Sequence, residues 1–222
     1  MNKKIIEFNL NNEDHLNKFK HFYDDVFSKS FIRDEIGSLQ AYIDLLKNSS
    51  EDTGVYNLFF TEIDDKFVAC HIFDQFPRIE CTAAEFSCVD PSYRGNGLST
   101  ELMREAYSRK RIGNWLFCEI EKDNLVNQKI WSNFGFKLIP VEYTQLPLGS
   151  DRGTVDKLLL CVKPIGSNVS SIPSETVKKF VWYYYKYSQF CDDPDRNPQY
   201  LEICKQCDSV RTFDLLEFKY SG

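Results

Sequence analysis

The sequence predicts a mixed α/β fold followed by a mainly helical C-terminal extension. An apolar strand pattern at 80–89 runs through a glycine-rich turn into an amphipathic helix pattern that begins at Leu98. A second strand and helix follow at 115–136, and two strand patterns joined by a short turn precede them at 55–73. Strands that alternate with helices in this way are typical of a sheet with helices packed on it.

The N-terminal third supplies a first strand, two helices and a hairpin. Alternating residues predict a strand at 3–10, and apolar spacing predicts helices at about 13–29 and 34–47. The apolar stripe of the second helix consists of Ile36, Leu39, Tyr42, Ile43 and Leu46. Strands are predicted at 55–63 and 66–73.

The centre of the chain carries the most regular patterns. In the strand at 80–89, alternate residues form two faces, and Glu85 shares its face with Val89. The following helix repeats apolar residues every four positions, and Gly113 ends it. Beyond the strand and helix at 115–136, we expect two more strands at 137–145 and 155–162.

The C-terminal segment follows a linker at 164–168. It predicts a helix at about 174–188, a Pro- and Asp-rich turn at 191–198, a second helix to about Asp208 and a final extended piece. Residues 181–187 include four of the twelve tyrosines of the chain. So aromatic a segment must bury much of its surface, either on the rest of the chain or, in a homodimer, on another subunit.

Composition indicates a soluble globular protein that can bury one sizeable core. Of its 222 residues 42% are hydrophobic, and no apolar run approaches the ~18 residues of a membrane span. The N-terminus does not resemble a signal peptide, so we expect the cytoplasm and reduced thiols for the eight cysteines. The net charge of −6 disfavours nucleic acid and slightly favours a cationic substrate.

Cys204-x-x-Cys207 raises the alternative of a zinc site. With Cys191 upstream it could form part of one, but no second cysteine pair or histidine follows at ligand spacing. Buried cysteines in a helix are the preferred interpretation, so we expect no metal.

The turn between Val89 and Leu98 has the composition of a phosphate-binding loop. Gly95 and Gly97 lack a Cβ, so backbone N–H groups can approach an anion at the positive end of the following helix, and Arg94 adds a cation. The spacing matches neither a P-loop nor a dinucleotide fingerprint.

Two motifs resemble the GNAT superfamily of acetyl-CoA-dependent N-acyltransferases. Arg94-Gly95-Asn96-Gly97-Leu98-Ser99 is similar to its Arg/Gln-x-x-Gly-x-Gly/Ala pyrophosphate loop, with Ser99 where Gly or Ala is usual. Residues 124–136 resemble its second signature, in which an Asn opens a helix, an aromatic follows seven residues later and Gly-Phe closes it. The resemblance covers about 3–163 and implies a mixed sheet of about seven strands. We therefore expect an acetyltransferase domain at 1–165 and an extension packed on it at 166–222.

The resemblance implies direct acetyl transfer from acetyl-CoA to a primary amine of a small molecule. Glu85 is the candidate general base, because the family places its base there or at the position of Ala83. Cys88 itself is an alternative as a nucleophile for a covalent acetyl-enzyme. The cofactor-binding residues implied are Cys88, Val89, Arg94, Gly95, Asn96, Gly97, Leu98, Ser99, Asn124, Asn127 and Trp131. The candidate substrate-contacting residues are Phe27, Phe31 and Arg33.

Trp131 departs from the family pattern, which often has a tyrosine there to protonate the departing thiolate. An indole N–H does not shuttle protons near neutral pH, so another tyrosine does so, the thiolate leaves unprotonated, or catalysis is lost. Two alternatives to the small-molecule enzyme stay open: acetylation of a macromolecule, and a non-catalytic acyl-CoA-binding module. The C-terminal segment could likewise cover the acceptor cleft or simply complete the core.

Overall fold

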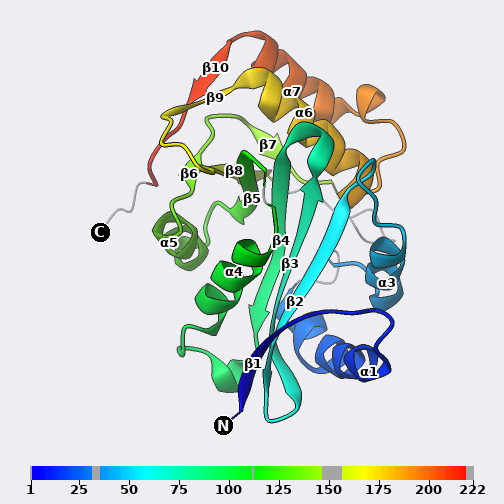
Figure 1. The fold of residues 1–222 in the computed structure, drawn as a ribbon. Coiled ribbons are helices and arrows are strands. Elements are labelled where there is room, and N and C mark those ends of the chain that lie inside the picture. Colours follow the sequence, from blue (N-terminus) through cyan, green and yellow to red (C-terminus); the bar gives the residue numbers. More distant parts are fainter. Residues whose placement is uncertain (1, 32–35, 112, 147–156, 219–222) are drawn as a thin grey trace. The chain divides into compact units, whose positions relative to one another are not determined.

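The computed structural model describes residues 2–31, 36–111, 113–146 and 157–218. These divide into two compact units: unit 1 holds residues up to 75 and residues 85–111, and unit 2 holds 76–84 and the remainder from 113. The main sheet has strand order β1-β2-β3-β4-β5-β8-β6, with β7 also paired to β8, and β9 and β10 form a second small sheet (Figure 1). The predicted mixed α/β class is confirmed.

Unit 1 contains an antiparallel sheet with helices on both faces. Its elements are β1 (Lys3–Glu7), α1 (Glu13–Phe22), η1 (Tyr23–Phe27), α2 (Ser28–Ser30), α3 (Leu39–Lys47), β2 (Val55–Ile63), β3 (Lys66–Phe76), the second half of β4 (Cys81–Val89), η4 (Pro91–Tyr93) and α4 (Leu98–Arg109). The last residue of β3, Phe76, is counted with unit 2. The hairpin β2–β3 turns at Asp64 and Asp65, as predicted.

Alternation along β2 and β3 separates the two faces of that sheet. Leu58 and Phe60 belong to an aromatic core with residues of α1, η1 and α3. On the other face, Tyr107 of α4 contacts the rings of His71 and Phe73. The helix that begins in the glycine loop is therefore held on the sheet by its own buried stripe.

Two predicted boundaries in unit 1 were wrong for local reasons. The first strand ends at Glu7 rather than at position 10, because the turn that follows is closed by Asn9 and Asn12. The Asn12 side chain accepts hydrogen bonds from the N–H groups of Asp14 and His15 and so caps α1. The second helix begins at Leu39, where Ser38 is the N-cap; residues 32–35 lie outside the described part of the chain.

Unit 2 combines the rest of the main sheet with the C-terminal segment. Its elements are the start of β4, η3 (Pro77–Ile79), β5 (Trp115–Glu121), α5 (Leu125–Asn133), β6 (Lys137–Leu138), β7 (Tyr143–Thr144), β8 (Lys157–Pro164), β9 (Ser171–Pro173), α6 (Ser174–Tyr183), η5 (Tyr184–Ser188), η6 (Pro194–Arg196), α7 (Pro198–Asp208) and β10 (Thr212–Asp214). The two predicted C-terminal helices are confirmed, the first ending in a π-helical turn.

The single strand predicted at 137–145 is instead two short strands. Pro140 lies between them and has no N–H to donate to a neighbour, so the ladder breaks there. Both pieces still pair antiparallel with β8. The strand predicted at 155–162 is β8, described from Lys157 onward.

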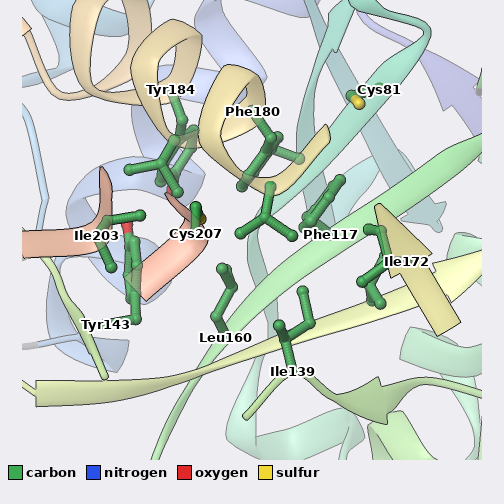
Figure 2. Packing of buried hydrophobic residues seen from close by; sticks show 14 of the residues in the cluster. Cys81, Phe117, Ile139, Tyr143, Leu160, Ile172, Phe180, Tyr184, Ile203 and Cys207 are labelled. Carbon is green, nitrogen blue, oxygen red and sulfur yellow. The ribbon is translucent and has the colours of Figure 1, made fainter. Parts of the chain in front are cut away.

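The C-terminal segment forms much of the core of unit 2 (Figure 2). Phe180 of α6 stacks on Phe117 of β5 with ring centroids 3.7 Å apart and planes 5° from parallel. Ile172, Ile203 and Cys207 join the same cluster from β9 and α7. Within this unit, the segment therefore completes the core.

Removing the Phe180 ring should show how much this packing contributes to the stability of the fold. Phe180→Ala is expected to lower the free energy of unfolding by about 3–5 kcal/mol, because a buried aromatic side chain leaves a cavity. Lys179→Ala, one residue away on the exposed face of α6, is the matched control and should change it by less than about 0.5 kcal/mol. Chemical denaturation measures both, and equal effects would contradict the assignment of this core.

No helix in the described ranges is both long and apolar enough to cross a membrane.

Candidate functional site

The glycine-rich loop connects β4 to α4 through a short 3-10 turn. The Asp90 side chain accepts a hydrogen bond from the N–H of Ser92 at 2.8 Å and fixes the start of the turn. Gly95 and Gly97 have φ of +79° and +72°, the left-handed region that favours glycine. These two residues let the chain reverse direction and enter the helix within three positions.

The start of α4 is open toward the loop. Gly97 is the N-cap of the helix and has no side chain to satisfy the first N–H groups. Beyond its own chain neighbours, a Cβ at Gly95 or Gly97 would meet nothing within 4 Å. The unsatisfied donors, the positive helix end and the free space above both glycines fit an anionic group such as a pyrophosphate.

Arg94 and Asn96 stabilise the loop from within. The Arg94 Nε donates to the Val89 carbonyl at 3.0 Å, and its side chain is otherwise exposed. The Asn96 amide donates to the Tyr93 carbonyl at 3.0 Å. Arg94 therefore holds the end of β4 while its exposed guanidinium keeps a positive charge at the loop.

Ser99, the departure from the family motif, has a partner on β4. Its hydroxyl oxygen lies 3.1 Å from that of Ser87, at hydrogen-bond distance. Glycine or alanine could not make this link. The serine therefore ties the first turn of α4 to the strand that carries Glu85.

Glu85 and Cys88 lie on β4 in the same unit as the loop. Glu85 is half-buried, and its negative charge adds to burial in raising the pKa of Tyr42 and Tyr56. Cys88 is buried with its sulfur 3.6 Å from that of Cys70. Its sulfur faces another thiol rather than a base, so the nucleophile alternative gains no support from its contacts.

The three candidate substrate residues have different environments. Phe27 is fully buried and contacts Phe86 of β4, with ring centroids 5.6 Å apart. Phe31 is half-buried and contacts the same ring at 5.1 Å. Arg33 lies outside the described residues. Phe31 is thus placed on the β4 face beside Phe86, with Phe27 behind it as part of the core.

The second signature lies in unit 2, on α5. Asn124 caps this helix by accepting from the N–H of Asn127 at 3.1 Å, and its amide donates to Glu121 at 2.9 Å. The Asn127 side chain is exposed. Trp131 is half-buried and packs edge-on against Phe136, with ring centroids 4.9 Å apart. These contacts give Asn124 and Trp131 structural roles in the helix.

β4 and β5 stop pairing part of the way along their length. Their parallel register runs from Cys81 with Trp115 to Ala84 with Cys118. β5 continues to Glu121, paired with β8 on its other side. Glu119 is therefore the first residue of β5 beyond the segment that pairs with β4.

Glu119 was missed by the sequence reasoning. Its carboxylate accepts hydrogen bonds from Tyr143, from Tyr184 at 3.3 Å and from the Gln189 amide at 3.3 Å. Burial raises its pKa to about 7, although these hydrogen bonds act in the opposite direction. The available signal was one acid inside the otherwise apolar run 115–120.

The family model of the acetyltransferase (GNAT) family matches residues 16–136, which is more than half of the chain. This protein therefore belongs to the GNAT family of acetyltransferases, acetyl-CoA-dependent acyltransferases. The match includes the glycine loop and the second signature, as the resemblance implied. No curated protein matches the sequence significantly.

Solved structures share the fold at low sequence identity. A protein from Bacteroides thetaiotaomicron assigned to the GNAT family of acetyltransferases aligns with a TM-score of 0.63 and 14% identity, over 85% of this chain and 98% of that one. The ribosomal-protein-S18-alanine N-acetyltransferase of Escherichia coli gives 0.52 and 17%, over 76% and 97%. The yncA protein of Salmonella typhimurium, assigned as an acetyltransferase and solved with acetyl-CoA, gives 0.52 and 14%, over 76% and 97%.

Proposed function

We propose that this protein is a cytoplasmic N-acetyltransferase that moves the acetyl group of acetyl-CoA directly to a primary amine of a small molecule. The observation that carries the proposal is the open N-terminus of α4 above Gly95 and Gly97. A pyrophosphate bound there would accept from the first N–H groups of the helix and lie beside the Arg94 guanidinium. Family membership supplies acetyl-CoA as the acyl donor.

Within this proposal, the strand that leads to the loop carries the acceptor chemistry. An amine arrives protonated and must lose a proton before it can attack the thioester carbonyl. Glu85 is a half-buried carboxylate on β4, one residue before Phe86, whose ring Phe31 contacts. We assign it the role of proton acceptor, with Cys88 and Val89 contributing their backbone to the acyl group, as in the family.

The proposal of a small-molecule acceptor rests on the net charge of the protein. The chain has a net charge of −6, which attracts small cations and disfavours nucleic acid. Proteins of this fold also act on macromolecules, as the name of the Escherichia coli enzyme states. Acetylation of a protein, or acyl-CoA binding without transfer, is therefore an outcome that the assay must distinguish.

Coenzyme A should stabilise the folded protein. At a concentration 100 times its dissociation constant the expected gain is about 2.7 kcal/mol, because the ligand binds only the folded state. A thermal shift with millimolar coenzyme A measures this. Transfer from acetyl-CoA to a panel of small amines then separates an enzyme from a binding module. No shift at all would refute the acetyl-CoA site.

A further inference from the structure

Glu85 is followed on β4 by a ring that belongs to a partly exposed aromatic pair. The pair consists of Phe86 and of Phe31, which directly follows the short helix α2 in the same unit. Their ring centroids are 5.1 Å apart and their planes are 73° from parallel, so the rings meet edge to face. Both side chains are half-buried. The pair therefore leaves apolar surface available to a ligand.

Two fully packed rings hold this aromatic pair from behind. Phe27 of η1 contacts Phe31 at 5.1 Å and Phe86 at 5.6 Å between ring centroids. Tyr42 of α3 contacts Phe27 at 5.4 Å and Phe86 at 6.2 Å. Both supporting side chains are buried. Because the pair is already fixed by this packing, little conformational entropy is lost when a ligand binds to it.

The hydroxyl group of Tyr42 is anchored at Gly37, just before α3. The Gly37 N–H donates to the Tyr42 hydroxyl oxygen at 3.3 Å, and the Gly37 carbonyl accepts from the Tyr23 hydroxyl at 2.7 Å. Tyr23 in turn stacks on Phe27, with ring centroids 5.7 Å apart. A Cβ at Gly37 would come within 3.2 Å of the Cβ of Ala41, so a glycine suits this close packing. The two tyrosines thus tie the supporting rings to the backbone at the start of α3.

The negative charge of Glu85 acts on the same cluster of rings. Burial raises the pKa of Tyr42, and the charge of Glu85 raises it further. The carboxylate therefore lies near the ring that supports the aromatic pair. A carboxylate beside an apolar surface fits a molecule with a positive charge at one end and a carbon arm behind it. A polar arm would lose its hydrogen bonds to water against phenylalanine rings, which offer none in return.

We propose that the acceptor is a primary amine with an apolar arm of the size of a phenyl ring, and that Phe31 and Phe86 are the residues that select it. This inference rests on the proposed function. The ammonium group lies at Glu85, and the arm packs on the two rings. Tyr23 and Tyr42 are positioning residues, because they act through the supporting rings rather than on the acceptor.

The test compares two amines that differ in this arm, phenylethylamine and ethylamine. For the wild type, kcat/KM should be about 10- to 100-fold higher for phenylethylamine, because its ring leaves water. Phe31→Ala should remove much of this preference and leave kcat/KM for ethylamine and KM for acetyl-CoA unchanged. Phe190→Ala removes an exposed ring from unit 2 and is the matched control, which should keep the wild-type preference.

A second pair of variants tests the positioning role. Tyr42→Phe keeps the ring and removes only the hydroxyl contact with Gly37, so KM for phenylethylamine should rise by about 2- to 10-fold. Tyr107→Phe loses a similar hydroxyl contact, with His71 at 2.8 Å, on the other face of the same sheet. It should lower the melting temperature without changing the preference between the two amines. Equal effects of the two variants on that preference would overturn the positioning role.

The outcomes separate this inference from the proposed function. Equal kcat/KM of the wild type for the two amines, or an unchanged preference in Phe31→Ala, overturns the inference while acetyl transfer itself is still observed. The wild-type comparison needs no variant, so it decides the question even if Phe31→Ala does not fold. Failure of the wild type to acetylate any amine in the panel overturns the proposed function and this inference with it.

Discussion

Gly97→Val should abolish the thermal stabilisation by coenzyme A while the protein remains folded. The valine Cβ and methyl groups would occupy the open space above the first turn of α4, where a pyrophosphate would approach the backbone. The φ of +72° adds strain of about 1–2 kcal/mol for a residue with a Cβ. The measurement is the coenzyme A thermal shift and the dissociation constant by calorimetry.

Strain and bulk can be separated by two further substitutions. Gly166 has φ of +73° and nothing within 4 Å of a Cβ, yet it lies in unit 2, in the segment after β8. Gly166→Val should carry a similar strain and bind coenzyme A normally. Gly97→Asn places a side chain in the same space with less strain, because Asn tolerates the left-handed region, and should also bind weakly. Normal binding by both Gly97 variants would place the cofactor elsewhere.

The glycine loop was predictable because its chemistry is local. Strand, turn and helix occupy the 29 consecutive positions 81–109, and the positive φ angles of the turn follow from two glycines. The hairpin at Asp64 and the two C-terminal helices were predictable for the same reason, because short-range sequence patterns determine them. The break at Pro140 was also local, and the missing N–H of proline was a sufficient signal for it.

The Glu119 cluster could not be predicted in this way. Its donors are 24, 65 and 70 residues away in sequence, so only the packing of α6 and η5 on β5 brings them to one carboxylate. The contact between Ser99 and Ser87 had the same limit, because the sequence shows both serines but not that their hydroxyl groups meet. Asn124 shows the opposite case: the motif predicted a cofactor contact, and the structure shows a helix cap, while cofactor binding stays a prediction.

Glu85→Gln should lower the rate of acetyl transfer to the true amine by about 10² to 10⁴ near neutral pH. Glutamine keeps the size and much of the hydrogen bonding of the half-buried side chain but cannot accept a proton. The affinity for coenzyme A should not change, because the glycine loop and α4 are untouched. Glu51→Gln, an exposed acid in a turn of the same unit, is the control and should behave as the wild type.

The pH dependence of the rate distinguishes a proton-accepting Glu85 from a purely structural one. At high pH the amine is already deprotonated in solution, so the deficit of Glu85→Gln should shrink as the pH rises toward the pKa of the amine. A purely structural role would leave the deficit constant across the range. If Glu85→Gln instead turned over at the wild-type rate at pH 7 with the same profile, the amine proton would go elsewhere and Glu85 would be an ordinary strand residue. Steady-state rates with one amine from pH 6 to 10 distinguish these outcomes, since the ionisation of the amine itself is common to every variant.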